Sequence, residues 1–355
     1  MQPRDSNLTR GRGAGLNPKN RFEKLEYVAD PDAELDPDDE LRPLRTQFLK
    51  DATQSIITYN NSPDIGFEAS LNPYRGCEHG CAYCFARPTH EFLGFSAGLD
   101  FESKIVVKEN APELLHAELS ARKWKPQVLI MSGVTDCYQQ IERTLEITRR
   151  CLGVMAEFRQ PVGIITKNHL VTRDIDHLKT LAAHQAALVN ISITTLDAEL
   201  AKTLEPRASA PSRRLAAVEE LSAAGIPVRV LMAPCIPGLN DHEMPAIFAA
   251  VAKAGARGVG YVPLRLPGAV APVFEDWLER TLPGQKEKIL SRVRAMRGGK
   301  LNDPRFGSRM SGEGFYATEM RNLYQLARHK AGFPKEMPEL STAAFRVPTN
   351  QLSLF

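Results

Sequence analysis

Residues 71–87 read Leu-Asn-Pro-Tyr-Arg-Gly-Cys-Glu-His-Gly-Cys-Ala-Tyr-Cys-Phe-Ala-Arg and contain three of the six cysteines of the 355-residue chain. These are Cys77, Cys81 and Cys84, separated by three and by two residues, so one short loop can present three thiols to a single centre. The glycine before each of the first two cysteines allows a tight turn with positive φ. In a reducing compartment, such a cluster is typical of metal binding rather than of disulfides.

The composition of the whole chain is that of an ordinary globular protein. Hydrophobic residues make up 43% and charged residues 25%, and the formal net charge is +3. No apolar run approaches the roughly 18 residues that a membrane span requires. The first residues, Met-Gln-Pro-Arg-Asp-Ser, are polar and basic with no apolar stretch behind them, which argues against a secretory signal. We therefore expect a cytoplasmic protein with no membrane partner.

The first 57 residues show little hydrophobic periodicity. A basic, glycine-containing start passes into an acidic run over residues 30–40. This pattern predicts a charged and largely unstructured N-terminal extension. Such an extension most simply maintains solubility, and a nucleic-acid-binding arm is the alternative.

From about residue 60, short apolar runs alternate with helical patterns. The runs cover residues 67–71, 128–131, 162–165, 188–193, 228–232 and 259–264. The helices are expected after Asn110 and over residues 141–158, 173–184, 212–224 and 243–254. This alternation predicts parallel β-α units with right-handed crossovers, and six units are too few for a closed eightfold barrel. We expect an α/β fold with a partial (β/α)6 barrel over residues 58–280, whose active site lies at the carboxyl ends of the strands.

The chain from residue 281 to residue 355 is predicted to be a small basic and helical C-terminal region. Eight lysines and arginines between residues 286 and 309 face only Glu287 and Asp303, and a helix is expected over residues 319–329. Such a patch could contact the phosphates of a nucleic acid. Phe306 and Phe315 stand only at its end, so the sequence does not predict base recognition.

The spacing of the three cysteines restricts the metal centre that they could hold. Thiolates suit iron–sulfur clusters and zinc. A structural zinc site needs four ligands, usually from two cysteine pairs; no second pair exists here, and His79 or His90 would have to supply the fourth ligand. Three cysteines without a fourth leave one iron of a four-iron cluster open to an exogenous molecule, which favours a catalytic centre.

The motif also resembles a known family. Its Cys-x3-Cys-x2-Cys spacing, with Tyr83 just before the third cysteine, is similar to that of the radical S-adenosylmethionine (SAM) enzymes. Within that superfamily, Asn-Pro-Tyr-Arg-Gly-Cys at residues 72–77 and Cys-Phe-Ala-Arg at residues 84–87 resemble the spore photoproduct lyase-like group, also called DNA repair photolyase-like. The resemblance covers about residues 60–330.

The resemblance implies a mechanism and its cofactors. A 4Fe-4S cluster on the three cysteines would bind SAM through the amino and carboxylate groups of SAM. An electron from a donor such as flavodoxin or ferredoxin would then cleave SAM, and the resulting 5'-deoxyadenosyl radical would abstract a substrate hydrogen. The cofactors carry this chemistry, and the protein must orient the substrate and exclude water.

Polar residues at the predicted strand ends are candidates for holding SAM. The loop after the second strand lacks the Gly-Gly-Glu-like motif of the superfamily, so Ser132, Thr135 or Asp136 would contact the SAM amino group. Each of these residues is also an ordinary turn former. The resemblance places Lys167, after the third strand, at the SAM carboxylate, and Tyr83 beside the adenine.

Three further residues complete the predicted site. After the fourth strand, Ser192 offers a hydroxyl and Arg207 a guanidinium suited to a carboxylate. Spore photoproduct lyase uses a cysteine outside its cluster to return a hydrogen atom to the product radical, and Cys137 is the candidate for that role here. The alternative is that Cys137 is a chemically idle loop residue.

Two classes of function remain open on sequence grounds. The first is a radical SAM enzyme that acts on a nucleic acid, or on a peptide or small molecule. The second is an iron–sulfur or zinc module that binds nucleic acid without catalysis, in which the cysteines only stabilise a loop.

Overall fold

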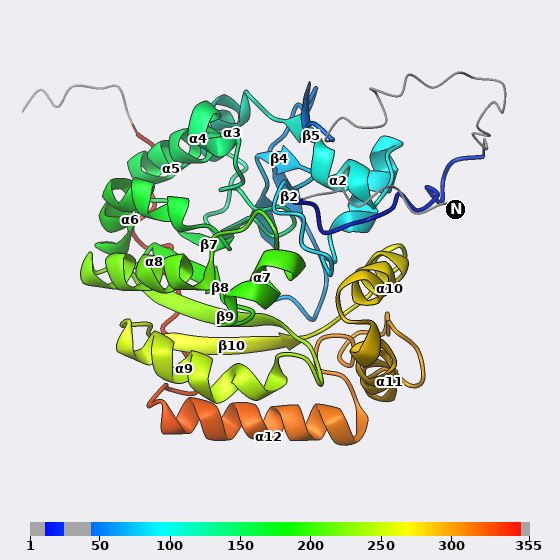
Figure 1. Ribbon diagram of the computed structural model, residues 1–355. Helices are drawn as coiled ribbons and strands as arrows, with labels where there is room; N and C mark the ends of the chain where they lie inside the picture. The colour runs from blue at the N-terminus through cyan, green and yellow to red at the C-terminus, as the bar shows by residue number, and fades with distance from the viewer. Residues whose placement is uncertain (1–10, 25–43, 349–355) are drawn as a thin grey trace, which may run out of the picture.

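The computed structural model describes residues 11–24 and 44–348 of the chain, and a seven-stranded sheet forms its centre (Figure 1). The strand order is β10-β9-β8-β7-β6-β3-β2, in which β2 is antiparallel to β3 and all other pairs are parallel. The strands are β2 (Ile57–Tyr59), β3 (Ala69–Leu71), β6 (Leu129–Met131), β7 (Val162–Thr166), β8 (Ala187–Ser192), β9 (Val228–Cys235) and β10 (Gly258–Pro263). All six predicted parallel strands are confirmed.

Helices cover one face of this sheet in the order of the strands that they connect (Figure 1). In β9, the side chains of Val228, Val230 and Met232 are fully buried against this helical layer, whereas Arg229 and Leu231 on the other face are partly exposed. The covering helices are α3 (Ala111–Ser120), α4 (Glu142–Leu145), α5 (Ile147–Phe158), α6 (Ile175–Ala182), α8 (Pro211–Ala223) and α9 (Met244–Lys253). In the described part of the chain, β2 and β10 do not pair with each other, so the barrel is partial, as predicted.

Two helix predictions differ from the structure in detail. The helix predicted over residues 141–158 is broken at Glu146, whose φ of 51° belongs to the left-handed region and separates α4 from α5. Helix α3 begins directly after Asn110 as predicted, but the Asn110 side chain makes no capping hydrogen bond. The start of α3 was therefore predicted correctly.

The prediction of an unstructured N-terminal extension is wrong for its described residues. Strand β1 (Gln47–Lys50) pairs in parallel with β5 (Lys104–Val107), which also pairs with β4 (Tyr74–Arg75). All four side chains of β1 are exposed, so backbone hydrogen bonds rather than a buried apolar face hold this strand. That is why hydrophobic periodicity did not reveal it. Residues 1–10 and 25–43 lie outside the described part of the chain.

Residues 11–16 lie against the cysteine-containing loop. The backbone N–H groups of Gly13 and Ala14 donate to the carboxylate of Glu102, over 3.0 and 2.8 Å, and Arg12 donates to the Glu102 carbonyl over 2.6 Å. A Cβ atom on Gly13 would stand 1.8 Å from the backbone oxygen of Gly80, so only glycine fits at that contact. The extension is thus part of the folded body at this point.

The C-terminal region is helical, as predicted, and it extends across the fold. Its helices are α11 (Lys286–Met296) and α12 (Gly314–Lys330), and α12 packs along α9 (Figure 1). Helix α10 (Val270–Thr281) precedes this region. Beyond α12, the backbone of Ser341 donates to Gln185 and that of Arg346 to Phe158, next to the amino ends of β8 and β7. The tail therefore crosses the end of the sheet opposite to the expected active site.

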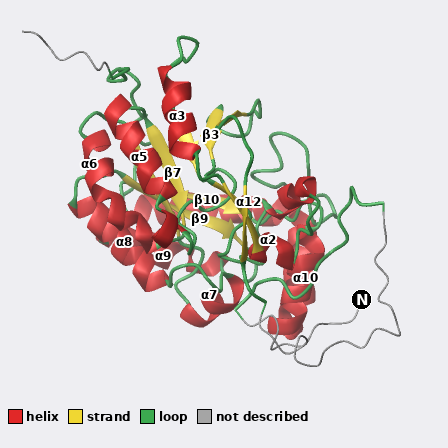
Figure 2. Cartoon of the chain, turned by 90° about the horizontal axis from the view of Figure 1, so that it is seen from above, coloured by secondary structure: helices red, strands yellow, loops and turns green. Residues whose placement is uncertain are grey.

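Short helical segments complete the structure. They are η1 (Arg87–Leu93), α2 (Leu99–Ser103), η2 (His169–Asp174), α7 (Ala198–Leu204), η3 (Asp241–Glu243) and η4 (Pro283–Gln285). Viewed from above, α7 and α10 stand on the same side of the sheet as α2 (Figure 2). None of the helices in the described ranges combines the length and hydropathy that a membrane span requires.

Candidate active site

The cysteine loop leaves β3 and β4 and lies over the carboxyl end of the sheet. Gly76 and Gly80 have φ values of +77° and +65°, so both turns use the left-handed conformation that favours glycine. Cys77 and Cys81 are 7% exposed, Cys84 is partly exposed, and all three thiols are free. The sequence motif therefore forms one compact, shielded group of sulfur donors.

The electrostatic surroundings of these thiols suit a metal cluster. Burial raises the pKa of the Cys81 thiol to about 12 and also raises the pKa values of Cys77 and Cys84. The cation of Lys167 opposes that effect at Cys81 and Cys84, because it stabilises the thiolate form. Three buried thiolates need more positive charge than one lysine supplies, and iron ions would provide it.

The two histidines that could complete a zinc site have other neighbours. His79 contacts Asp136 over 3.3 Å, and His90 lies between the rings of Phe95 and Phe101, so neither histidine joins the cysteines.

Residues between the first two cysteines fix the loop to neighbouring strand ends. The carboxylate of Glu78 accepts from the backbone of Ile141 over 3.1 Å and pairs with Arg207 over 3.5 Å. Arg207 also donates to the hydroxyl of Thr46 over 3.4 Å, in the N-terminal extension. The structure thus brings the predicted Arg207 to the cysteine loop, but as a residue that supports Glu78.

The loop after β6 is held by its own polar groups. The hydroxyl of Ser132 accepts from the backbone N–H of Cys137 over 2.7 Å, and the hydroxyl of Thr135 donates to the Tyr74 carbonyl over 2.6 Å. The carboxylate of Asp136 accepts from the backbone N–H of Lys167 over 2.8 Å. All three predicted residues therefore lie at the strand ends, and each uses its side-chain oxygen in a hydrogen bond to the protein backbone.

Asp136 remains ionised in spite of its burial. Burial raises its pKa, but His79 and the donor N–H groups outweigh that effect and lower the pKa to about 2. Its carboxylate also accepts from the hydroxyl of Thr166, over 2.8 and 3.0 Å. Asp136 thereby joins the cysteine loop to the ends of β6 and β7.

Lys167 and Tyr83 face each other beside the cysteines. The ammonium nitrogen of Lys167 lies 5.7 Å from the centre of the Tyr83 ring. Within the described ranges, Lys167 forms no salt bridge, and its side chain is only half-buried. A cation without a partner at this place can receive an anionic group of a bound molecule.

A buried ion pair beneath Tyr83 is a functional feature that the sequence analysis did not single out. Glu205 pairs with Arg214, and both side chains are almost fully buried. Glu205 also accepts from the hydroxyls of Tyr83 and Thr194. Burial raises the pKa of Glu205, but Arg214 and Lys167 outweigh this and lower it to about 2.

The sequence contained a signal for that pair. Arg214, Ala217, Val218 and Leu221 are spaced as one face of the helix predicted over residues 212–224, and all four are buried in α8. An arginine on an otherwise apolar face requires a buried carboxylate partner. This signal indicates that Arg214 has a partner, but it does not identify Glu205.

The structure separates Cys137 from the other predicted site residues. Its side chain is 0% exposed and belongs to the main hydrophobic core, with Cys151 and Leu152 of α5. Burial raises the pKa of its thiol far above the ordinary value. The thiol is enclosed in the core in this structure, and the hydrogen-donor role of Cys137 stays a prediction. Ser192 lies buried at the end of β8, and its contact with SAM stays a prediction.

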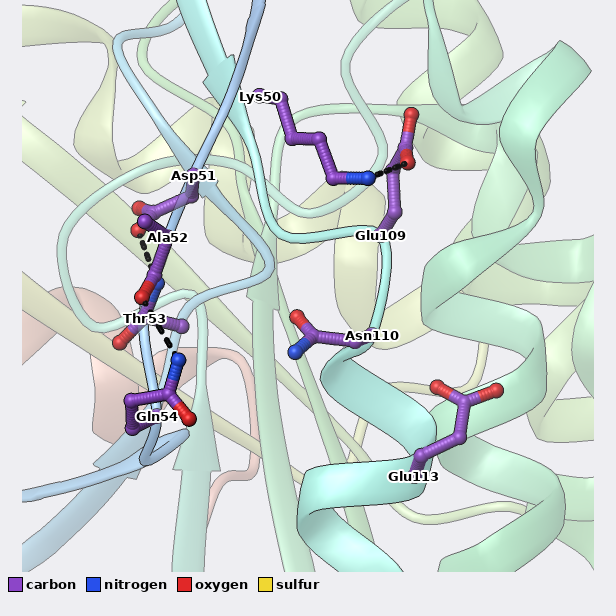
Figure 3. A pocket seen from close by; sticks show the side chains of 8 residues that line it. All are labelled: Lys50, Asp51, Ala52, Thr53, Gln54, Glu109, Asn110 and Glu113. Carbon is purple, nitrogen blue, oxygen red and sulfur yellow. Dashed lines mark hydrogen bonds and ion pairs between the residues drawn. The ribbon is translucent and has the colours of Figure 1, made fainter.

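A surface hollow lies elsewhere, between the end of β1 and the start of α3 (Figure 3). Its walls include the surface ion pair of Lys50 and Glu109, separated by 3.6 Å. None of its lining residues belongs to the predicted site. They are Lys50, Asp51, Ala52, Thr53, Gln54, Glu109, Asn110 and Glu113.

Comparison with known proteins identifies the family. Residues 71–251, which begin at the end of β3 and include the cysteine loop, match the model of the radical SAM superfamily. The chain belongs to the radical SAM superfamily. Membership implies that this radical SAM protein is an enzyme that uses SAM and an iron–sulfur cluster, as the resemblance predicted.

Relatives of this radical SAM protein occur in bacteria and archaea. It is 34% identical over 238 residues to an uncharacterized protein of Mycobacterium tuberculosis, covering 66% of this chain and 69% of that one. It is 32% identical over 178 residues to an uncharacterized protein of Methanocaldococcus jannaschii, covering 50% and 64%.

The solved structure of spore photoproduct lyase complexed with dinucleoside spore photoproduct has a similar fold. The TM-score is 0.59 at 14% sequence identity, and the match covers 80% of this chain and 79% of that chain. This similarity confirms the predicted radical SAM fold.

Proposed function

We propose that this protein binds a 4Fe-4S cluster through Cys77, Cys81 and Cys84 and uses it to start radical chemistry on a nucleic acid. The observation that carries the proposal is the loop with three largely buried thiols at the carboxyl end of a parallel sheet. Three cysteine ligands would leave one iron of a four-iron cluster open. The open position is where SAM would bind.

The cofactors would supply the bond cleavage: one electron breaks the C5'–sulfur bond of SAM, giving methionine and a 5'-deoxyadenosyl radical that takes a hydrogen atom from the substrate. Lys167 would bind the carboxylate of SAM, because its cation faces the cysteines without a salt bridge. Tyr83, fixed by Glu205, would pack beside the adenine. Ser132, Thr135 and Asp136 would shape the loop near the SAM amino group, and Ser192 would extend this surface.

The environment of the site suits radical chemistry. The Arg87–Glu102 pair on one side of the cysteine loop is completely buried, and so is Glu205 on the other. Fixed, water-free charges hold the loop in one conformation and protect a reactive intermediate from side reactions. The electron would come from a small reductant such as flavodoxin or ferredoxin.

Two observations support a nucleic acid as the substrate. The segment from residue 286 to residue 309 is strongly basic. In addition, the structure is similar in fold to an enzyme solved with a dinucleoside photoproduct, although that similarity by itself concerns the fold alone. A peptide or a small molecule would use the same cofactors, and substrate screening separates these cases.

The test begins with anaerobic reconstitution, followed by iron and sulfide analysis and by incubation with dithionite and SAM. We expect about four irons per chain and formation of 5'-deoxyadenosine. Cys84→Ser should lose both. Cys151→Ser is the matched control, because Cys151 is buried in α5 away from the loop, and it should keep both.

A second function, a nucleic-acid-binding module without catalysis, predicts a different result. Its protein would bind zinc or a fully liganded cluster and would form no 5'-deoxyadenosine from SAM. That outcome with properly folded, oxygen-protected protein would refute the proposed enzyme.

A further inference from the structure

The rim of the sheet beside β10 holds an arginine that forms no salt bridge within the described ranges. Arg265 follows β10 by two residues, and its Nε atom is buried without a hydrogen-bond partner. Its Nη1 atom donates to the sulfur of Met310 over 3.0 Å. A thioether is a weak acceptor, and no carboxylate pairs with Arg265 within residues 11–24 and 44–348. A partly buried guanidinium in this state favours a bound anion.

Neighbouring carboxylates do not supply an anion that pairs with Arg265. The carboxylate of Asp64 accepts from Arg309 over 2.5 Å and from the backbone of Gly307 over 2.7 Å. Arg297 stands close as well, donating to the Leu264 carbonyl over 2.9 Å. Burial and the cation of Arg309 lower the pKa of Arg265 and outweigh the carboxylate of Asp64, which raises it.

Arg265 lies on the same rim as the cysteine loop. Leu264 and Leu266, on either side of it, pack in one hydrophobic cluster with Cys81 and Tyr83. Gly268, three residues after Arg265, also lies close to this loop: a Cβ on Gly268 would be 3.8 Å from the side chain of Pro88, in η1 directly after the cysteine loop. The backbone that carries Arg265 is therefore packed against the cysteine loop.

An exposed aromatic ring accompanies this arginine. Phe306 is 62% exposed, and the guanidinium of Arg309 lies 4.5 Å from the centre of its ring. Asp64 anchors the loop that carries both residues, through Arg309 and Gly307. The sequence alone placed Phe306 at the end of the basic segment, whereas the structure places it beside the arginines of the rim. An exposed ring next to basic groups is the arrangement on which nucleic-acid bases stack.

We propose that Arg265 and Phe306 form a nucleotide subsite, in which Arg265 binds a phosphate of the substrate strand and Phe306 stacks against a base. This inference rests on the proposed function and specifies its substrate as a single-stranded or locally unpaired nucleic acid. A guanidinium binds carboxylates and phosphates alike. The exposed ring and the basic segment, in which Lys300 is exposed, favour the nucleotide.

The experiment measures fluorescence anisotropy of a short, labelled single-stranded DNA with the anaerobically reconstituted protein and SAM. Arg265→Gln should weaken binding about tenfold at low salt and reduce the slope of log Kd against log salt by about one phosphate contact. Phe306→Ala should weaken binding about tenfold at every salt concentration. The matched controls are Lys179→Gln on α6 and Phe48→Ala on β1, both exposed and outside the basic segment, and they should bind like the parent protein.

The binding results test the nucleotide subsite independently of SAM cleavage. Stronger binding of RNA with the same dependence on Arg265 and Phe306 supports the subsite and identifies RNA as its ligand. The proposed subsite is overturned if the parent protein binds neither DNA nor RNA at low salt, or if both variants bind like their controls. Formation of 5'-deoxyadenosine without substrate should be unchanged in both variants. Its absence from the parent protein would refute the proposed function, and the anisotropy data would still test the subsite.

Discussion

The Glu102 carboxylate joins the N-terminal extension to the cysteine loop, and Glu102→Gln tests this connection. Glu102 pairs with Arg87 over 2.5 Å, both side chains being 0% exposed, and accepts the N–H groups of Gly13 and Ala14. Arg87 in turn donates to the Cys81 carbonyl over 2.8 Å. Loss of the charge would leave a buried guanidinium without its counter-ion.

The expected magnitude follows from this burial. Removing one partner of a buried ion pair costs about 3–5 kcal/mol. Glutamine keeps the shape and one acceptor oxygen, so we expect a decrease of about 3 kcal/mol in the free energy of unfolding. Glu109→Gln is the matched control: the Glu109 side chain is 56% exposed and lies 3.6 Å from Lys50, and such surface pairs contribute about 0–1 kcal/mol.

Two assays on anaerobically reconstituted protein measure the effect. Urea unfolding, followed by circular dichroism, gives the change in free energy. Limited trypsin digestion reports local release of the extension, because Lys19 and Arg21 are in the docked segment. Gly13→Ala should release the segment as well, since its Cβ would collide with the Gly80 oxygen. Gly66→Ala, where a Cβ meets open space, should not.

The reasoning would be refuted if Glu102→Gln were no less stable than Glu109→Gln and trypsin cut both at the same rate. Faster cleavage of Gly13→Ala with unchanged unfolding energy would agree with it, because that change displaces the segment but leaves the Arg87–Glu102 pair in place.

Three further predictions concern single side chains. Burial lowers the pKa of His90 from 6.5 to about 4, so the unfolded chain takes up a proton before the folded one does as the pH falls. The free energy of unfolding should then drop by about 2 kcal/mol between pH 7 and pH 5. In urea unfolding, His90→Phe should lack this contribution to the drop. Equal pH dependence of the unfolding free energy in the parent and in His90→Phe would contradict the prediction. Lys167→Gln should weaken SAM binding about tenfold with unchanged iron content, as calorimetry and iron analysis can show, and unaltered affinity would exclude its proposed role. Cys137→Ala should lower stability by about 1 kcal/mol. Because the thiol lies in the core, we expect product formation as in the parent, and a changed product would support the predicted hydrogen-donor role.

The sequence predicted the main sheet because most of its strand residues are buried. Runs such as residues 188–193 are therefore largely apolar, in spite of Asn190 and Ser192, and they stand out between amphipathic helices. β1 gave no such signal, because its side chains are exposed and its partner β5 lies more than 50 residues away. The docking of residues 11–16 was missed for a related reason: polar contacts with Glu102 hold it, and composition does not show them.

The cysteine motif could be predicted to bind a metal centre from its spacing alone. The contacts of single side chains could not be predicted, because they depend on the direction in which each side chain points in the fold. The spacing of Cys77 to Cys84 sufficed to find the donor group. Cys137 follows a strand of the same sheet, but its sequence position does not show that its thiol points into the helical core. The partner of Arg214 could not be predicted either. Glu205 reaches Arg214 through the turn after α7, and no local sequence pattern specifies that turn.

Electron paramagnetic resonance of the reduced, anaerobically reconstituted protein, recorded with and without SAM, tests the central claim most directly. We predict the signal of a reduced 4Fe-4S cluster whose g-values shift when SAM is added, and which is lost in Cys84→Ser but kept in Cys151→Ser. A signal that SAM does not change, or a protein that takes up zinc in place of iron, would contradict the account.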